Sequence, residues 1–320
     1  MENKNILVTS AGRRVSLVKA FKKELKKYCP NGKLFVVDQD PELSAAAQVS
    51  DKYFKVCNVN NSEYIDDLIS ICIYNAIGLI IPTIDFELLK LSENINRFEE
   101  YNIQVVVSNP EWIDRFSSKI KTKKFFEDIG IPVFSVYTKQ NYKFPLFIKP
   151  ISGSSSKENY IINSEKDFTK NHFTNDELAF FEYIDPNQFD EYTCDLYFNK
   201  KGLLTCTISR IRISIRGGEI SKGRTIKNNL KRIIESKFNY FEGLRGPITV
   251  QFFMNKQDES VIGIEVNPRF GGGFPLSYEA GGNYPKWIIE EYLFNKQLDY
   301  FDDWEENLLM LRYDKAIFIR

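Results

Sequence analysis

The run from Val261 to Gly273, VIGIEVNPRFGGG, constrains this chain more than any other stretch. Its first half, Val261 to Val266, is rich in β-branched residues and is followed by turn-forming residues, which predicts a strand. Side chains alternate between the two faces of a strand, so Glu265 and Asn267 are expected to project from the same face. Two oxygen ligands at the end of a rigid strand suit a hard divalent cation such as Mg²⁺.

The residues after this pair extend the prediction toward phosphate. Arg269 follows the end of the strand, where its guanidinium group could reach phosphate oxygens that share the metal. Gly271 to Gly273 would let the backbone come close to a ligand. The alternative is a surface hairpin with an ordinary glycine turn, and these residues alone do not decide between the two interpretations.

The composition of the chain narrows the chemistry to a few residue types. Its 320 residues are enough for two or three domains, and its 43 basic and 43 acidic residues balance, so no nucleic-acid partner is expected. No apolar run is long enough to span a membrane, and the N-terminus leads into an apolar strand without a signal peptide. The five scattered cysteines predict reduced thiols in a cytoplasmic protein. Because His172 is the single histidine, any chemistry falls to carboxylates, amides, lysines, arginines and the backbone.

Strands and helices alternate through the N-terminal third, which predicts a doubly wound parallel sheet. The expected strands are residues 5–9, 33–38, 78–82 and 104–108, and the expected helices are residues 15–27, 64–74 and 86–98. A nicotinamide site would need GxGxxG at the first turn, whereas here Gly12 is followed by Arg13 and Arg14, so that interpretation is rejected. Asp85 and Glu87 follow the third strand, at the edge where such sheets bind ligands, although the more ordinary role for Asp85 is to cap the next helix.

The middle of the chain carries features that suit a phosphate. A lysine-rich helix is expected over residues 117–129, and a short apolar strand over residues 144–150 brings Lys149 next to the loop from Ser152 to Lys157. A lysine beside a small flexible loop binds phosphate through its charge and through backbone and hydroxyl donors. The alternative is a serine- and glycine-rich surface turn, and the loop lacks the GK[ST] ending of a P-loop.

Two later features suit the rest of a nucleotide. An apolar strand over residues 178–184 could link two lobes and present backbone groups to the flat edge of an adenine. Glu191 begins the next strand, and its carboxylate could accept hydrogen bonds from ribose hydroxyls.

The C-terminal part predicts a sheet around the opening strand. Strands are expected over residues 203–215 and 246–254, a helix over residues 230–241, and a strand pair that finishes the sheet over residues 308–319. The strand at 246–254 would form a hairpin with the strand at 261–266. That hairpin places Gln251 near Glu265 and adds a third oxygen to the predicted metal site.

Three arginines accompany the strand over residues 203–215. Arg210, Arg212 and Arg216 are separated by even numbers of residues and so fall on one strand face, where cations repel one another unless an anion joins them. They are therefore predicted either to bind phosphate or a carboxylate substrate, or to be solvated with Glu219 as a partner.

In this order, the motifs resemble the ATP-grasp superfamily, and more narrowly its carbamoyl-phosphate-synthase-large-chain-like branch of single-module ligases. NILVTSAGRRVSL at residues 5–17 and PTIDFEL at residues 82–88 look like the preATP-grasp domain of that branch, and the ExNPRxGGG run is the most specific match. The resemblance covers nearly the whole chain. It implies an α/β fold (α+β ATP-grasp), with a doubly wound preATP-grasp domain over residues 1–110 followed by a two-lobed ATP-grasp domain. The linker helix and small lobe would span residues 111–185, and the large lobe with the metal site would span residues 186–320.

The resemblance also implies roles for individual residues. ATP would contact Lys119 and Lys149, the loop residues Ser152, Gly153, Ser154 and Ser155, the hinge residues Glu182, Tyr183 and Ile184, and the ribose-binding Glu191. The implied metal ligands are Gln251, Glu265 and Asn267, and the implied catalytic residues are Arg269, Lys149 and Arg210. Three features depart from the family pattern. The loop has Ser156, Lys157 and Glu158 where the family usually has a second glycine. Lys119 follows Ser118 where relatives have an aspartate, and Gln251 stands where many relatives have a carboxylate.

The activity that the resemblance implies is ATP-dependent activation of a carboxylate. ATP would convert a substrate acid to an acyl phosphate, and an amine would attack it to form an amide or peptide-like bond. This chemistry needs positioning and charge neutralisation rather than a protein nucleophile. The implied cofactors are ATP and Mg²⁺, with two ions expected and Mn²⁺ as a substitute.

The partners are expected to be a small carboxylate and a small amine, without nucleic acid or membrane, and a homodimer is compatible with this expectation. Two alternatives remain open at this point. One is a nucleotide-binding regulatory or interaction protein without turnover, and the other is a carbamoyl-phosphate-forming module that depends on partner subunits. The sequence does not identify the acid or the amine.

Overall fold

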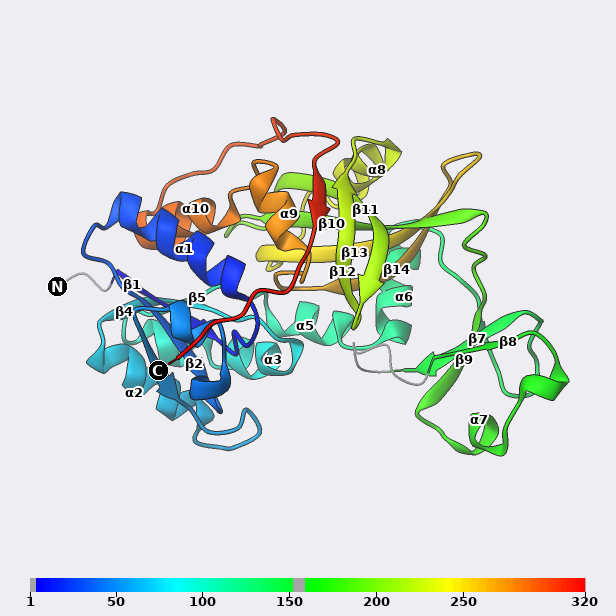
Figure 1. Ribbon diagram of the computed structural model, residues 1–320, viewed down its shortest axis with the longest axis horizontal. Coiled ribbons are helices and arrows are strands. Elements are labelled where there is room, and N and C mark those ends of the chain that lie inside the picture. The colour runs from blue at the N-terminus through cyan, green and yellow to red at the C-terminus, as the bar shows by residue number, and fades with distance from the viewer. Residues whose placement is uncertain (1–3, 152–158, 320) are drawn as a thin grey trace.

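The N-terminal part of the chain is a five-stranded parallel sheet with helices on both faces. In the computed structural model, which describes residues 4–151 and 159–319, its strand order is β3-β2-β1-β4-β5 (Figure 1). Ile6 and Val8 of β1 pack with α1 on one face, whereas Leu7 packs with α2 and α3 on the other. The predicted doubly wound sheet is confirmed. Its strands are β1 (Asn5–Thr9), β2 (Leu34–Asp38), β3 (Lys52–Lys55), β4 (Ile77–Ile81) and β5 (Gln104–Val105), and its helices are α1 (Val15–Tyr28), α2 (Tyr64–Tyr74), α3 (Asp85–Glu93) and α4 (Ile95–Glu99).

A six-stranded antiparallel sheet forms the centre of the molecule, with the order β14-β13-β10-β11-β12-β15. Helices α6 and α8 pack on one face over Cys194, Leu196 and Phe252. The elements are β10 (Phe189–Phe198), β11 (Leu204–Arg216), β12 (Glu219–Thr225), β13 (Gly246–Asn255), β14 (Val261–Asn267), β15 (Leu309–Leu311), α5 (Pro110–Phe116), α6 (Lys119–Asp128), α8 (Asn229–Lys237), α9 (Phe274–Glu279) and α10 (Tyr284–Ile288).

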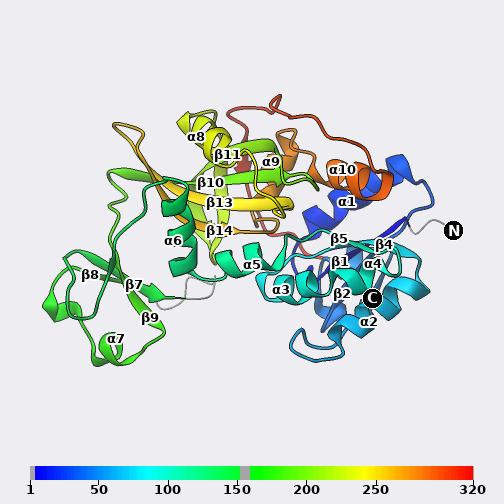
Figure 2. The same cartoon turned by 180° about the vertical axis from the view of Figure 1, so that it is seen from behind.

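A small lobe lies at the end of the molecule away from the N-terminal sheet, as both views show (Figures 1 and 2). Its four-stranded antiparallel sheet has the order β6-β9-β7-β8, and its own core includes Leu146, Ile148 and Phe180. The lobe comprises β6 (Val136–Tyr137), β7 (Leu146–Pro150), β8 (Tyr160–Ile162), α7 (Lys170–Thr174) and β9 (Leu178–Glu182). Single-turn helices occur at Pro41–Leu43, Ala47–Val49 and Glu165–Asp167, and a π-helical turn occurs at Ile289–Leu293.

One hydrophobic core joins the N-terminal sheet to the second face of the central sheet. This shared core contains Val18 and Phe21 of α1 together with Ile208 of β11, Phe274 of α9 and Ile288 of α10, and each of these side chains is buried. Phe21 and Phe270 make an edge-to-face contact within this core, next to the glycine run, and their ring centroids are 5.8 Å apart. The packing therefore fixes α1 relative to the end of β14.

Several predicted elements differ from the observed ones. The helix expected over residues 86–98 is two helices that break at Asn94, and α5 was not expected at all. The strand expected over residues 104–108 covers only the two residues of β5. The strand pair expected over residues 308–319 is wrong, because only Leu309–Leu311 pairs, with β12, and the following residues are extended without a strand partner.

Within residues 4–151 and 159–319, no helix has the length and the apolar character needed to cross a membrane.

Candidate active site

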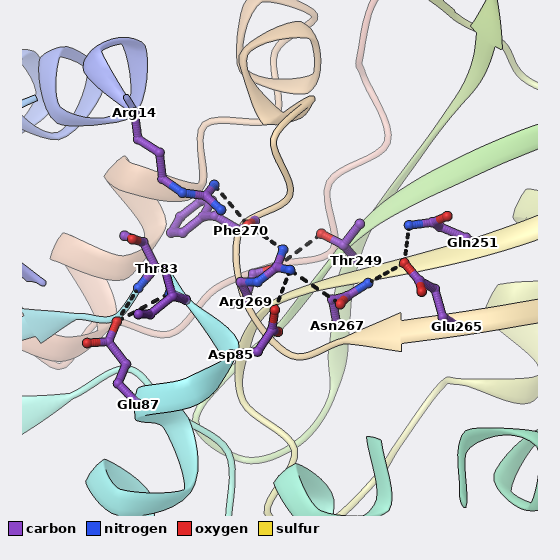
Figure 3. Close-up of polar contacts among 11 residues, drawn as sticks. Arg14, Thr83, Asp85, Glu87, Thr249, Gln251, Glu265, Asn267, Arg269 and Phe270 are labelled. Carbon is purple, nitrogen blue, oxygen red and sulfur yellow. Dashed lines mark hydrogen bonds and ion pairs between the residues drawn. The ribbon is translucent and has the colours of Figure 1, made fainter. Parts of the chain in front are cut away.

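The three predicted metal ligands meet on the β13–β14 hairpin. The register pairs Gln251 with Glu265 and Thr249 with Asn267, as the hairpin predicted. One carboxylate oxygen of Glu265, Oε1, accepts hydrogen bonds from Gln251 Nε2 at 2.5 Å and from Asn267 Nδ2 at 3.0 Å (Figure 3). All three side chains are partly buried at the mouth of a cavity.

This donor set fits a hard cation of the Mg²⁺ class. It offers one carboxylate and two amide oxygens, and no cluster of three acidic, histidine or cysteine side chains occurs in the described part of the chain. Both amides now point an N–H group at Glu265, so a bound cation would require them to turn their oxygens inward. Mg²⁺ keeps several ligands from water and phosphate, which suits a protein site with few carboxylates.

Arg269 connects this hairpin to the N-terminal part of the chain. Its Nη2 atom donates to Asp85 Oδ2 at 2.6 Å and to Asn267 Oδ1 at 3.3 Å. The expected cap role of Asp85 is wrong, because the carboxylate of Glu87 accepts from the backbone N–H groups of Thr83 at 2.9 Å and Ile84 at 3.3 Å. Asp85 is therefore free of helix capping and instead holds Arg269 at the carboxyl edge of the parallel sheet.

Arg14 lies beside Arg269 and was not among the predicted site residues. Arg14 Nη1 and Arg269 Nη1 both donate to the carbonyl oxygen of Phe270, at 3.0 Å and 3.2 Å (Figure 3). Burial, and then the charge of Arg269, lowers the pKa of Arg14 to about 10. Its position directly after β1, at the ligand-binding edge of a doubly wound sheet, was the sequence signal that could have singled it out.

The three arginines of β11 do not form one anion site. Arg210 is buried and makes two hydrogen bonds to Asp195, at 3.1 Å and 3.2 Å. Arg212 pairs with Glu191 and donates to Gln251 Oε1 at 3.0 Å. Arg216 lies beyond two register shifts of the strand and pairs with exposed Asp314. The structure thus separates Arg216 from the other two arginines, whereas Arg210 and Arg212 both line the same cavity, each beside a carboxylate of its own.

Arg210 packs directly against the glycine run from Gly271 to Gly273. A Cβ atom on Gly273 would lie 2.5 Å from Arg210 Nη1, and one on Gly271 would lie 2.9 Å from Thr249 Oγ1. A Cβ atom on Gly272 would lie 2.9 Å from the carboxyl carbon of Glu219. Glycine is needed at these positions because the loop packs directly against the side chains of Thr249, Glu219 and Arg210, which line the cavity.

Lys149, the lysine predicted to bind phosphate, lies over the rings of phenylalanine side chains. Lys149 Nζ lies 5.0 to 5.2 Å from the ring centroids of Phe181 and Phe134. Burial, and then the charge of Lys119, lowers the pKa of Lys149 to about 8, while Glu265 and Glu191 oppose this shift. Both lysines are therefore close enough to Glu265 for its negative charge to act on them.

The remaining predicted nucleotide residues are placed as follows. Lys119 is the first residue of α6, and burial lowers its pKa while Glu265 opposes the change. Burial raises the pKa of Glu191, which lies on β10 and pairs with Arg212. Glu182 uses both its backbone N–H and its carboxylate to bind Ser135, at 2.9 Å and 2.8 Å. Ser152, Gly153, Ser154 and Ser155 lie outside the described residues.

Three cavities surround the β13–β14 hairpin and Arg14. A cavity of about 440 Å³ extends from Glu265 past Arg269 to Arg14, with Glu219 in its wall. A mostly apolar cavity of about 300 Å³ lies beside the same hairpin, between α3, α5 and α6. A third, of about 250 Å³, lies beyond Arg14 and shares Glu219 with the first. The largest has the size of a small-molecule site.

The sequence matches two described families in succession. Residues 6–106 match "PylC-like, N-terminal domain", and residues 116–273 match "ATP-grasp domain". The chain is 25% identical over 213 residues to carbamoyl-phosphate synthase of Methanobrevibacter smithii, which covers 61% of this chain and 56% of that protein. The chain thus matches little more than half the length of this curated relative.

Solved structures resemble nearly the whole chain. Biotin carboxylase of Campylobacter jejuni, solved as a β,γ-ATP complex, has a TM-score of 0.69 and 17% identity, with 96% of this chain and 74% of that chain covered. The biotin carboxylase domain of Hydrogenobacter thermophilus 2-oxoglutarate carboxylase, solved as a dimer with MgADP, ADP and bicarbonate, has a TM-score of 0.69 and 15% identity, with 96% and 73% covered. These identities show a common fold. The two family matches show that the chain belongs to the ATP-grasp superfamily, with a PylC-like N-terminal domain ahead of its ATP-grasp domain.

Proposed function

We propose that this chain uses ATP and Mg²⁺ to phosphorylate a substrate carboxylate, and that an amine then attacks the acyl phosphate to form an amide or peptide-like bond. In the first step a carboxylate oxygen bonds to the γ-phosphorus of ATP and the bond to the β,γ-bridging oxygen breaks, which releases ADP. In the second step the amine nitrogen bonds to the acyl carbon, phosphate leaves, and the nitrogen loses a proton.

The observation that carries this proposal is the line of polar side chains from Lys149 through Glu265 and Asn267 to Arg269, which ends in the 440 Å³ cavity. A phosphoryl group held near Glu265 would have cations on two sides, at Lys149 and at Arg269. Phosphoryl transfer is accelerated mainly by such positioning and charge neutralisation. The cavity beyond Arg269 leaves space for an acid in line with the transferred group.

Mg²⁺ bound by Glu265, Asn267 and Gln251 would neutralise phosphate charge and hold the nucleotide in register. The amides of Gln251 and Asn267 would have to turn toward it. Arg212, which donates to both Gln251 Oε1 and Glu191, would lose its contact with Gln251 and keep its contact with Glu191, which would hold that carboxylate in place for the ribose.

The nucleotide would lie between the small lobe and the central sheet. Lys119, Lys149 and the loop at Ser152, Gly153, Ser154 and Ser155 are proposed to contact its phosphates. Because Ser135 engages Glu182, the adenine contacts fall to the backbone of Tyr183 and Ile184. Cations on both lobes would neutralise the negative charge of the triphosphate, and this attraction would draw the two lobes together around it.

Hydroxylamine trapping tests this proposal without knowledge of the amine. The purified full chain is incubated with MgATP, hydroxylamine and one carboxylic acid at a time, and hydroxamate and ADP are both measured. We expect at least one acid to give hydroxamate in equal amount to ADP, and only with Mg²⁺ present. Glu265→Ala and Lys149→Ala should each lower this rate by roughly 10² or more, as loss of a transition-state charge contact does.

Lys166→Ala serves as the matched control, because Lys166 is an exposed lysine of the same small lobe. Its rate should equal that of the unmodified chain. An unchanged rate in both Glu265→Ala and Lys149→Ala would show that the site is misassigned. Tight MgADP binding with no hydroxamate from any acid would instead favour a regulatory nucleotide-binding protein.

A further inference from the structure

Two guanidinium groups from distant parts of the chain meet at one carbonyl oxygen. Arg14, at the start of α1, and Arg269, just after β14, both donate to the Phe270 carbonyl. Like charges held this close repel each other, and a single neutral acceptor does little to offset that repulsion. A pair of this kind is stabilised when an anion binds between its members.

The acidic groups nearby neutralise the pair only in part. Asp85 binds Arg269 at 2.6 Å, but within residues 4–151 and 159–319 no carboxylate lies within ion-pair distance of Arg14. Glu219 acts on Arg14 through its charge, yet its carboxylate is hydrogen-bonded to Arg312 at 2.9 Å. Arg269 Nε is buried and has no hydrogen-bond partner among the described residues. Both arginines therefore keep donors that no described protein group accepts.

The arginine pair lies at one end of a series of hydrogen bonds that starts at Glu265 on the β13–β14 hairpin. Hydrogen bonds lead from Glu265 to Asn267, from Asn267 to Arg269, and from Arg269 to the Phe270 carbonyl that Arg14 shares (Figure 3). Arg14 lines both the 440 Å³ cavity and the adjoining 250 Å³ cavity. An anion bound between the two arginines would thus lie at the end of the cavity away from Lys149. We call this the acid end, because the substrate acid would bind there.

The loop that carries Arg14 is held in place before any ligand binds. Ser10 adopts a left-handed backbone conformation, with φ of 51°, and its hydroxyl donates to buried Glu87 at 3.1 Å. The Gly12 carbonyl oxygen accepts from Ser44 Oγ at 3.1 Å and from the Ala46 N–H at 3.0 Å. A preorganised donor binds an anion without an ordering cost at the moment of binding.

We propose that Arg14 and Arg269 together bind the carboxylate of the acid substrate, so that the N-terminal domain supplies a residue that determines which acid is accepted. This inference rests on the proposed function, because it assigns the acid end of the same site. Arg269 would contact both the carboxylate and the transferred phosphoryl group, whereas Arg14 would contact the carboxylate alone. Loss of Arg14 should therefore weaken acid binding and leave nucleotide binding unchanged.

The first test uses Arg14→Gln and Arg14→Lys in the hydroxamate assay, with the acid that gives the highest rate. We expect Arg14→Gln to raise the KM for the acid by roughly tenfold to a hundredfold, the range for loss of one charged hydrogen-bonding group, and to leave the KM for MgATP within about twofold. Arg14→Lys should restore part of the affinity because it keeps the charge but not the planar fork. Arg216→Gln, a change in an exposed arginine outside the cavity, should have no effect.

The second test does not depend on turnover. The full chain saturated with MgADP is titrated calorimetrically with bicarbonate, acetate and succinate, at constant ionic strength. The unmodified chain should bind at least one of these anions, and Arg14→Gln should bind it at least tenfold more weakly. MgADP affinity and the thermal melting of each variant report whether the substitution disturbs the fold.

The outcomes separate this inference from the proposed function. If no acid yields hydroxamate but an anion binds in an Arg14-dependent way, the ligase activity fails and the anion site stands. If hydroxamate forms and Arg14→Gln has an unchanged KM for the acid, the ligase activity stands and the role of Arg14 is wrong. Failure of the unmodified chain to bind any of the three anions would also overturn the role of Arg14.

Discussion

Lys149 is a cation in an environment that disfavours its charge. Its ammonium group lies over aromatic rings and near Lys119, and burial lowers its pKa to about 8. A phosphate bound at Lys149, as proposed, would favour the charged form, so nucleotide binding would be linked to proton uptake at this residue.

The linkage predicts how nucleotide affinity depends on pH. Below pH 8 the free protein already carries the charged lysine, and above pH 8 binding requires uptake of a proton. The Kd for MgADP should therefore rise above pH 8, by up to about tenfold per pH unit. Calorimetry between pH 7 and pH 10 measures it. Lys149→Arg, which stays charged throughout, should give a flat profile, and a parallel rise in that variant would refute the assignment.

The buried pair of Arg210 and Asp195 predicts an effect on stability. Both side chains are 2 to 3% exposed, and the carboxylate of Asp195 also accepts from Ser277 Oγ at 2.5 Å. Arg210→Ala leaves a buried charge without its partner, which should lower the free energy of unfolding by about 3–5 kcal/mol. Arg216→Ala removes an exposed pair and should change it by less than about 1 kcal/mol. Urea unfolding of both variants measures the difference, and equal midpoints would contradict the structural role.

The residues that sequence reasoning could place are those whose partners are local. Gln251, Glu265 and Asn267 come together because a hairpin fixes its own register, and strand alternation then sets the shared face. Arg14 contacts Phe270 across 256 positions of the chain, so no local pattern could pair them. Asp195, the partner of Arg210, lies on the neighbouring antiparallel strand at a sequence separation of 15, so this contact is as local as that of Gln251 with Glu265, but it was not among the contacts predicted from the sequence.

At the scale of elements, the start of α3 organises the ligand edge of the parallel sheet. Glu87 is fully buried, burial raises its pKa, and it accepts from Thr83 and Ile84 of the turn, from Tyr64 of α2 and from Ser10 after β1. One carboxylate therefore holds together three segments that surround the loop of Arg14.

Replacing the carboxylate of Glu87 should destabilise the loop that carries Arg14. Glu87→Ala removes the acceptor of two backbone N–H groups and of the hydroxyl groups of Ser10 and Tyr64, and should lower the free energy of unfolding by about 3 kcal/mol or more. Glu87→Gln keeps an acceptor for the turn and should cost less than half as much. Chemical denaturation compares the two, and hydrogen exchange at residues 10–14 should increase in the alanine variant. Equal stability of both variants would argue against the acceptor role.

Element boundaries were predictable where the hydrophobic period was long and uninterrupted. The helix over residues 64–74 and the strand at β14 fall close to their expected limits. The helix over 86–98 broke because Asn94 ends α3 and begins α4, a change of direction that the apolar spacing does not encode. The C-terminal residues failed to form a strand pair because only three of them reach the edge of β12.

At the scale of the whole molecule, the predicted boundary near residue 110 does not separate two independent cores. The shared core joins α1 to α9 and α10, whereas a different cluster on the far face of the parallel sheet contains only residues up to Ile113. The small lobe, by contrast, has its own cluster around Leu146 and Phe180.

This arrangement predicts which parts unfold together. Ile288→Ala, in the shared core, should cost about 2–5 kcal/mol and reduce the hydrogen-exchange protection of α1 and α10 in parallel. The matched change Leu68→Ala, in the far-face cluster, should reduce protection in the parallel sheet first. Exchange measured by mass spectrometry under native conditions distinguishes them. Loss of protection confined to α10 in Ile288→Ala would contradict a common core.

The shared core also bears on the order in which ligands bind. The shared core holds the start of α1 against the end of β14. A hinge motion that separated Arg14 from Arg269 would therefore expose Phe21 and Phe270 to water. If the two arginines bind the acid as proposed, their site would exist before nucleotide arrives, and either substrate could be the first to bind. A preference for a different acid would then arise by exchange of side chains along the cavity wall rather than by a change in domain motion.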